Sequence, residues 1–278
     1  MNDVRTAAAT PGDERFAFGD NWRSFLEELN DERIAESEKS LRWLTGRDRL
    51  DGLTFIDIGS GSGLSSLAAR RLGARAFSFD YDPQSVACTR SLRERFFRDD
   101  PDWTVEQGSV LDQNYMAKFD SFDIVYSWGV LHHTGAMWPA IENAARLVRP
   151  GGTFVFALYR KTRLCALWTL EKRWYCQASP AAQSAFQSFY VAMMRLAFRL
   201  VGRDFKSYVN NYRGNRGMNY MHDVHDWLGG YPYESVRPSE VEQEMKRLGF
   251  SHVRDKVQPY STGIFGSGCD EFVYQRVG

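Results

Sequence analysis

The sequence predicts an α/β fold: a mostly parallel, seven-stranded sheet with an antiparallel C-terminal strand and a helical lid insertion. Between residues 53 and 159, short apolar runs alternate with segments of helical pattern, which is typical of a parallel sheet with helices on both faces. Near the C-terminus, a glycine-rich connection too short for a helix joins two strand-like runs, so we expect antiparallel neighbours. The segment 160–233 interrupts this pattern, and insertions of that length commonly cover a binding site.

The first strand ends near Asp57 and leads into three glycines. Residues 64–73 follow as a helix that ends on a glycine, the usual residue after a helix C-terminus. A second strand is expected at 74–82, and Asp82 before Pro83 predicts the start of the next helix. Further elements are expected as strands at 104–110, 122–130 and 152–159 and as a helix at 137–148.

The closing elements begin with a helix, because Ser239 and Glu242 have the spacing of a capping box. Val241, Met245 and Leu248 then fall on one helix face. Two strands are expected at 250–260 and 269–277. The predicted divisions are a disordered N-terminus at 1–13, N-terminal helices at 14–50, the core at 51–159, the lid at 160–236, and the last helix with two closing strands at 237–278.

The composition is that of an ordinary globular protein, with 43% hydrophobic and 25% charged residues among 278 and a formal net charge of zero. No global field therefore attracts nucleic acid or a membrane. The charge is uneven, because the segment 160–216 holds eleven basic residues against two acidic ones. The four cysteines lack CxxC spacing, so we expect reduced thiols in a cytoplasmic protein, either a monomer or a homodimer.

The longest apolar stretch, residues 189–201, is too short to span a bilayer and is interrupted by Arg195 and Arg199. We expect this stretch to form the core of the lid. Because Arg203 adds a third basic side chain beside it, peripheral contact with a membrane surface stays open as an alternative.

The motif that indicates a ligand runs from Asp57 to Gly63, DIGSGSG, between a predicted strand and a predicted helix. Glycines there let backbone N–H groups approach a ligand in front of the helix N-terminus. Its spacing is GxGxG rather than the GxGxxG of dinucleotide sites, and a carboxylate precedes it, which favours a ligand with an ammonium group and no phosphates. Asp80 ends the second strand, where a carboxylate can accept both hydroxyls of a ribose.

These motifs, followed by GSV at 108–110, FDIVYSWGVLHH at 122–133 and RPGG at 149–152, occur in an order that resembles the class I S-adenosylmethionine-dependent methyltransferases. The resemblance covers about residues 54–159. It implies a Rossmann-like core, S-adenosyl-L-methionine as cofactor and S-adenosyl-L-homocysteine as product. FGDNW at 18–22, DWLGGYPYE at 226–234 and GCDEFV at 268–273 further resemble a bacterial subgroup of small-molecule methyltransferases.

The resemblance implies a role for each cofactor-binding residue at the strand ends. The methionine part would be held by Asp57, Gly59, Ser60, Gly61 and Gly63, the ribose by Asp80 with Tyr81 beside it, the adenine by Ser109 and Val110, and the sulfonium by a floor of Ser127 and Trp128. Ser109 departs from the family pattern, because many members carry an acidic residue at this position.

The acceptor site is predicted from the segment 218–234, which has neither helical period nor strand alternation and would close over the methyl group as an irregular lid end. The residues expected to bind the acceptor are Trp22, Arg213, Arg216, Tyr220, Trp227, Tyr231 and Tyr233. The two arginines favour an anionic acceptor and the rings an aromatic one. Hydrogen bonds or a base would come from His222, Asp223 and Glu234.

The histidines carry further alternatives. His132 and His133 follow the fourth strand, and either one is a candidate proton acceptor, unless it only packs inside the fold. His222 and His225, with two aspartates between and after them, have a spacing that could bind a metal. We predict no metal, because no helix is expected there to hold both imidazoles. The same polar groups would then tie the lid down by hydrogen bonds.

The predicted activity is transfer of a methyl group to an oxygen of a small molecule, in line and with water excluded by the lid. Three alternatives stay open: a methyltransferase for RNA or another nucleic acid, a membrane-associated enzyme for a quinone or lipid precursor, and a non-catalytic cofactor-binding protein. The fourth strand ends in Ser127-Trp-Gly rather than the Pro-Pro-aromatic turn of amino-directed base methylases, which makes nucleic acid the weaker choice.

Overall fold

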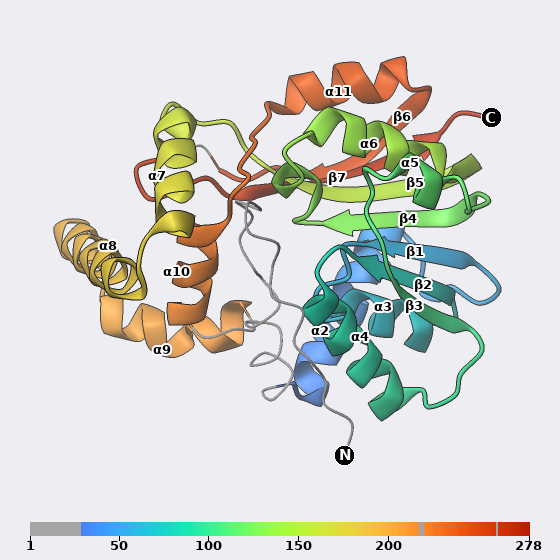
Figure 1. Ribbon diagram of the computed structural model, residues 1–278, viewed down its shortest axis with the longest axis horizontal. Coiled ribbons are helices and arrows are strands. Elements are labelled where there is room, and N and C mark those ends of the chain that lie inside the picture. The colour runs from blue at the N-terminus through green and yellow to red at the C-terminus, as the bar shows by residue number, and fades with distance from the viewer. Residues whose placement is uncertain (1–28, 217–219, 260) are drawn as a thin grey trace.

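The computed structural model describes residues 29–216, 220–259 and 261–278. Its centre is a seven-stranded sheet in the order β3-β2-β1-β4-β5-β7-β6, which confirms the predicted fold class (Figure 1). Five strands run parallel to one another: β1 (Thr54–Ile58), β2 (Arg75–Asp80), β3 (Trp103–Gln107), β4 (Phe122–Trp128) and β5 (Val148–Tyr159). β7 (Cys269–Arg276) is antiparallel to both β5 and the edge strand β6 (Phe250–Lys256).

Helices cover both faces of the sheet, as the alternating pattern predicts. One face packs against α5 (Gln113–Met116), α6 (Met137–Arg146) and α11 (Pro238–Arg247). The other face packs against α2 (Asp31–Thr45), α3 (Leu64–Arg71) and α4 (Pro83–Phe96). Figure 1 shows the two layers above and below the sheet.

The strand order places a switch point at β1. The chain builds β2 and β3 outward on one side of β1 and then returns to form β4 on its other side. In open sheets of this kind, ligands bind beyond the carboxyl ends of the strands at such a point. The short 3-10 helix η1 (Leu131–His133) lies in the loop after β4, at this same end of the sheet.

The lid consists of four helices beyond the carboxyl ends of the parallel strands (Figure 1). They are α7 (Cys165–Gln177), α8 (Pro180–Leu200), α9 (Phe205–Arg216) and α10 (Tyr220–Gly229). The expectation of an irregular segment here is wrong, because residues 220–229 are helical. Tyr220, Val224 and Leu228 recur every four residues and are buried in the lid core, so tertiary packing selects a helix despite the polar residues between them.

Two other expectations concern the start of the last helix, α11 (Pro238–Arg247), and the N-terminal segment. The last helix begins at Pro238, and the Arg237 amide donates to the Glu240 carboxylate at 2.7 Å, so Ser239 and Glu242 do not form its cap. The N-terminal segment at 1–13 and residues 14–28 of the segment expected to form N-terminal helices fall outside the described residues. Within the described ranges, no helix has both the length and the apolar character needed to cross a membrane.

Candidate active site

The glycine turn between β1 and α3 has a backbone that favours glycine. Gly59, Gly61 and Gly63 have φ angles of 77°, 53° and 82°, in the left-handed region. A Cβ atom at Gly59 would lie 2.4 Å from Cγ1 of Val130, in the loop after β4. Glycine is therefore required where the turn approaches the end of β4.

Asp57, at the end of β1, is buried behind this turn. Its carboxylate accepts a hydrogen bond from the Ser66 hydroxyl of α3 at 2.5 Å. Burial raises the pKa of Asp57 to about 7, against the Ser66 hydrogen bond, which favours the charged form. A cation bound nearby would therefore restore the charge. Ser60 is also buried, and its hydroxyl pairs with that of Thr89 at 2.9 Å, which gives it a structural role.

Asp80 is the last residue of β2, and its carboxylate joins the glycine turn after β1 to the loop after β2. Its Oδ2 accepts from the Gly61 amide at 2.9 Å, and its Oδ1 accepts from the Asp82 amide at 2.9 Å. Burial raises the pKa of Asp80 to about 6. A carboxylate has about four lone-pair sites, so further sites stay available to hydroxyl donors.

Large aromatic side chains follow or end the neighbouring strands β2 and β4. Tyr81 is 51% exposed and Trp128 45% exposed, so both present ring surface outward at the ends of β2 and β4. Ser127 is buried, and its hydroxyl donates to the Ile58 carbonyl at 2.9 Å. That bond ties β4 to β1 at the switch point.

The predicted adenine residues follow β3. The Ser109 hydroxyl accepts from the Leu111 amide at 3.2 Å, which shapes the turn after the strand. Val110 is buried, and its carbonyl accepts from the Asn143 side chain at 2.9 Å. Val110 therefore offers apolar surface, while Ser109 offers a hydroxyl that already supports its own turn.

The segment after α10 docks on the loop that follows β4. Nδ1 of His133 is 2.7 Å from the Pro232 carbonyl, and the Glu234 amide donates to the His132 carbonyl at 3.0 Å. A Cβ atom at Gly230 would lie 2.9 Å from Cε1 of His133, so the glycine permits this approach. Because a carbonyl only accepts, Nδ1 of His133 is the donor. Burial lowers the pKa of His133 to about 4, so its ring is neutral near pH 7.

Glu234, a predicted base, caps a core helix. Its Oε2 accepts from the Met137 amide at 2.9 Å, at the first turn of α6. Ala136, the residue that precedes α6, has no side-chain cap of its own. Burial raises the pKa of Glu234. The structure therefore gives this carboxylate a positioning role that joins lid and core.

Aromatic rings from core and lid gather around Tyr159 at the end of β5. The ring centroid of Tyr159 lies 4.1 Å from that of His132, 5.2 Å from Tyr233, 5.4 Å from His133 and 5.4 Å from Trp227. We call these five residues the Tyr159 cluster. The His132 ring nitrogens and Nε1 of Trp227 are buried without a well-formed hydrogen bond. Such groups are costly to bury unless a ligand or water satisfies them.

Lys172 of α7 completes this region and was missed by the sequence analysis, which counted it only within the basic segment. It is fully buried, and its Nζ lies 3.5 Å from the ring centroid of Trp227 and 5.3 Å from that of Tyr233. Nζ donates to the Trp227 carbonyl. Burial lowers the pKa of Lys172 to about 7, although the carboxyl of Glu171 favours the charged form.

Several predicted acceptor residues pack elsewhere in the lid. Asp223 accepts from the Tyr212 hydroxyl, and the rings of Tyr212 and Tyr220 lie 5.1 Å apart within the lid core. The Tyr231 amide donates to the Gly229 carbonyl at 2.6 Å in the turn after α10. Trp22 and the side chains of Arg213, Arg216 and His222 lie outside the part of the chain that the structure describes.

The reason given against a metal is wrong, because α10 does carry both His222 and His225. Nδ1 of His225 instead pairs with the Tyr175 hydroxyl at 2.7 Å and with the Gln187 amide at 3.0 Å. Among the described side chains, no group of three His, Cys, Asp or Glu residues could hold a metal ion.

Comparisons with known proteins match the core. Residues 56–156 match the family model described as a methyltransferase domain. The chain is 31% identical over 123 residues to a ubiquinone biosynthesis O-methyltransferase of Methylobacterium sp. (strain 4-46), over 42% of this chain and 45% of that protein. A ribosomal protein L11 methyltransferase of Pectobacterium carotovorum is 48% identical over 56 residues, or 20% of this chain and 19% of the other. The chain thus covers about half, or less, of the curated relatives it matches.

Solved structures share the fold. A magnesium protoporphyrin IX methyltransferase from Synechocystis with bound S-adenosylmethionine superposes with a TM-score of 0.56 and 14% identity, over 98% of this chain and 99% of that chain. The same enzyme with bound S-adenosylhomocysteine gives a TM-score of 0.55 over 92% of this chain and 93% of that chain. The glycine turn, the strand order and the family match agree, and the chain carries a class I S-adenosylmethionine-dependent methyltransferase domain at residues 56–156.

Proposed function

We propose that this chain transfers the methyl group of S-adenosylmethionine to an oxygen atom of a small acceptor that combines an aromatic ring with an acidic or anionic group. The observation that carries the proposal is the Tyr159 cluster beside the fully buried Lys172, at the same end of the sheet as Asp57 and Asp80. Relatives named as ubiquinone biosynthesis O-methyltransferases support a small acceptor that is methylated on oxygen.

The residues at the ends of β1 and β2 fit the cofactor. The glycine turn has the left-handed backbone that brings the ends of β1 and β4 close together, and Asp57 would regain its charge beside a ligand ammonium group. Asp80 has lone pairs for two neighbouring hydroxyls after its two backbone hydrogen bonds. The exposed ring of Tyr81 would lie next to the ribose. These roles follow the family resemblance residue by residue.

The Tyr159 cluster suits an aromatic acceptor. Tyr159, Trp227 and Tyr233 offer flat apolar walls, and aromatic pairs favour offset or edge-to-face contacts. The buried ring nitrogens of His132 and Nε1 of Trp227 have no well-formed hydrogen bond, so an acceptor could bond to them. The neutral Nζ of Lys172 would accept a hydrogen bond from the acidic hydroxyl of the acceptor, and the ammonium formed by proton transfer would be stabilised by the anionic oxygen.

The chemistry requires little covalent assistance, since S-adenosylmethionine supplies an electrophilic methyl group when bound. The residues must orient the acceptor oxygen in line, exclude water and receive the hydroxyl proton. Burial lowers the pKa of Lys172 to about 7, close to the value an efficient base needs near neutral pH. The hydroxyl proton would pass to the neutral Nζ of Lys172, which would leave the acceptor oxygen with a lone pair for the methyl carbon, and the nucleoside product would keep the electrons of the broken carbon–sulfur bond. Burial lowers the pKa of His133 to about 4 and that of His132 well below its ordinary value, so both rings orient rather than deprotonate.

The test uses methyl-labelled S-adenosylmethionine with a panel of phenol, catechol and hydroxybenzoate acceptors and with metabolite fractions. We expect an alkali-stable methyl ether in at least one phenolic acceptor, identified by mass spectrometry. Lys172→Met should lower turnover at least about 100-fold, the range of a lost general base. Its affinity for S-adenosylhomocysteine, measured by calorimetry, should stay unchanged.

Lys118→Met is the matched control, because that lysine lies on the core surface over the Tyr115 ring. The control should keep wild-type turnover. Label that appears in RNA and disappears after ribonuclease treatment would refute the proposal, and so would full activity of Lys172→Met.

A further inference from the structure

Two lid helices expose apolar side chains along one face each. On α7 these are Leu167, Leu170 and Trp174, spaced by three and four residues. On α8 they are Phe189, Met193, Leu196 and Leu200, spaced by four, three and four residues. Residues at these spacings are neighbours on a helix surface. Their exposed fractions range from 40% at Met193 to 78% at Leu200, which is unusual for large apolar side chains that could have packed inside.

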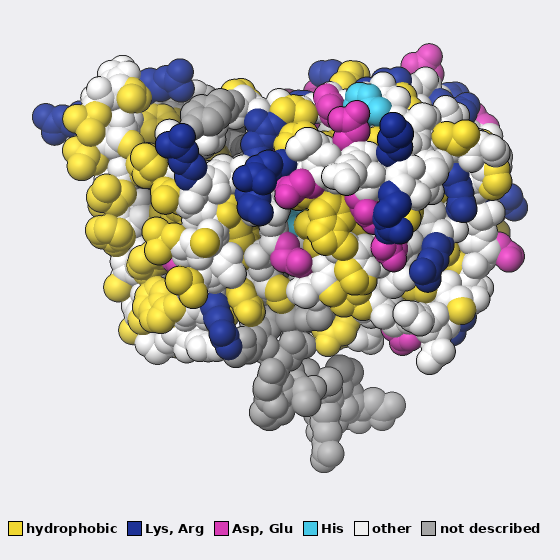
Figure 2. Space-filling view, turned by 90° about the horizontal axis from the view of Figure 1, so that it is seen from above, with side chains coloured by type: hydrophobic (Ala, Val, Ile, Leu, Met, Phe, Trp, Pro, Cys, Tyr) yellow, Lys and Arg dark blue, Asp and Glu magenta, His cyan; other side chains and the backbone are white. Residues whose placement is uncertain are grey.

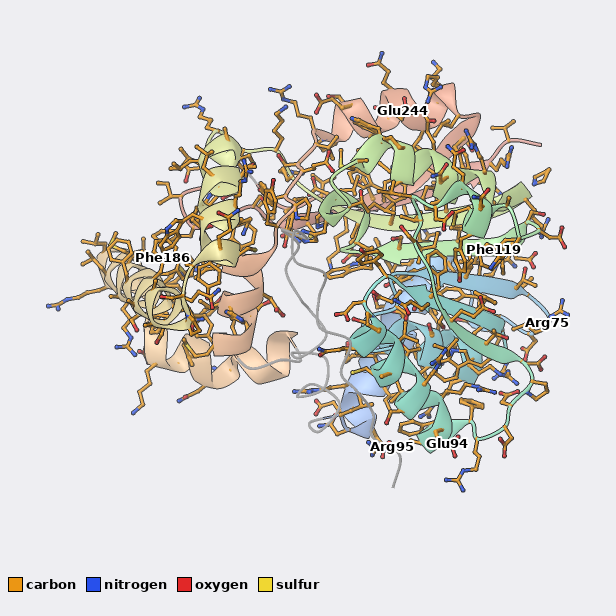
Figure 3. All side chains as sticks on the ribbon, viewed as in Figure 1. Arg75, Glu94, Arg95, Phe119, Phe186 and Glu244 are labelled. Atoms are coloured by element: carbon orange, nitrogen blue, oxygen red, sulfur yellow. The ribbon has the colours of Figure 1, made fainter. Side chains whose placement is uncertain are left out.

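The two faces are joined by a chain of rings. The centroids of Trp174 and Phe186 lie 5.2 Å apart, and those of Phe186 and Phe189 lie 6.1 Å apart. Figure 3 labels Phe186 at the outer side of the lid. We call this set the lid stripe: Leu167, Leu170, Trp174, Phe189, Met193, Leu196 and Leu200. The expectation that 189–201 forms the lid core is therefore wrong for this face, since Val191 alone of the residues of α8 is buried.

Basic side chains accompany the stripe. Arg195 and Arg199 are one turn apart on α8, Arg203 follows the helix, and all three are exposed. Between Pro180 and Leu200 the sequence contains no aspartate or glutamate. In Figure 2 the lid, at the left, shows hydrophobic and basic side chains with hardly any acidic ones, while the core carries both signs of charge.

We propose that the lid stripe docks on an anionic lipid surface, with α7 and α8 lying along it. A helix with Phe, Trp and Leu on one face and arginines beside them is typical of elements that lie in the membrane interface. The positive charge of these arginines favours a lipid surface over a second copy of the chain. Self-association through α8 would bring the arginines of two copies together, whereas anionic headgroups complement them.

The test is flotation of the full chain with vesicles of phosphatidylcholine alone or with added phosphatidylglycerol. We expect flotation only with the anionic vesicles, and loss of it in concentrated salt, because screening shortens the reach of the charges. Arg195→Gln with Arg199→Gln should weaken binding about 30-fold, since each basic residue near such a surface contributes about a kilocalorie. Leu196→Glu should remove most of the flotation.

Matched controls lie on the core. Val253→Glu changes a similarly exposed apolar residue of β6. Arg95→Gln with Arg98→Gln changes two exposed arginines, one in the last turn of α4 (Arg95, labelled in Figure 3) and one just beyond it. Both controls should float as the wild type does, and all variants should keep wild-type S-adenosylhomocysteine affinity as evidence of folding. Equal flotation of the stripe and control variants would overturn the proposal, as would no flotation on anionic vesicles. A dimer that Leu196→Glu converts to monomers, seen by light scattering, would assign the stripe to a second copy instead.

Discussion

Replacing Asp57 by asparagine should separate cofactor binding from stability. The wild-type carboxyl is buried at the end of β1 and accepts from the Ser66 hydroxyl at 2.5 Å. Asparagine keeps a side-chain oxygen for that hydrogen bond but cannot ionise. We therefore expect the variant to fold, to become more stable than the wild type as pH rises, and to bind S-adenosylmethionine more weakly.

The size of the stability effect follows from the pKa of Asp57. Burial raises it to about 7 in the folded chain, against an ordinary value of 3.8. Between those values the folded state retains a proton that the unfolded state releases, so wild-type stability falls as pH rises through this window. Three units correspond to at most about 4 kcal/mol. The Asp57→Asn variant lacks this loss, so the difference between the two proteins should be smallest near pH 4 and reach its full value above pH 7.

The assay is urea unfolding of both proteins between pH 4.5 and 8, combined with calorimetric titration of S-adenosylmethionine at each pH. Subtracting the variant from the wild type removes the contribution of titrating groups that do not interact with Asp57. The coupling to Asp80, whose charge also raises the pKa of Asp57, stays within the difference. Parallel stability curves for the two proteins would refute the argument that Asp57 holds a proton in the folded state. Equal affinities for the cofactor would refute its contact with the ligand ammonium group.

Three further predictions concern other contacts of the site. Gly59→Ala should lower the free energy of unfolding in urea by about 2–4 kcal/mol, because of left-handed backbone strain and the clash with Val130. Val130→Ala in the same chain should restore part of this stability, and no recovery would contradict the clash. Asp80→Asn should weaken S-adenosylhomocysteine binding about 10- to 100-fold by calorimetry, because a charged acceptor contributes about 1.5–3 kcal/mol, and unchanged affinity would exclude the ribose contact. Glu234→Ala should lower stability by about 1 kcal/mol through loss of the α6 cap, while Glu234→Gln keeps most of it and keeps turnover; an inactive Gln variant would identify a base instead.

The core could be predicted from the sequence because its signals are local. The turns after the strands contain residues that suit the local backbone, such as the glycines at 59, 61 and 63 with their positive φ angles. Asp82 before Pro83 caps α4 as expected, with its carboxylate accepting from the Gln84 amide at 2.8 Å. Periodicity and capping therefore determine most of the sheet and its flanking helices.

The lid could not be predicted in the same way, because its contacts join distant parts of the chain. Tyr159, Lys172 and Trp227 meet only after four helices have packed, and no spacing in the sequence links them. The buried stripe of α10 was present at every fourth residue, but Asp and His residues between its members obscured it. On α8 the sequence misleads in the opposite direction, because its apolar stretch predicts buried residues but is exposed on one face.

The lid leaves and rejoins the sheet at a single place. The Lys161 amide donates to the Val236 carbonyl and the Val236 amide to the Tyr159 carbonyl, each at 2.9 Å. Beside them Arg160 pairs with the buried Asp270 at 2.8 Å. The two ends of the insertion are therefore held together by these hydrogen bonds next to the sheet. A different lid could be inserted between residues 161 and 236 without a change in the order of the strands. Acceptor preference could then change by exchange of one module while the nucleoside-binding half stays constant.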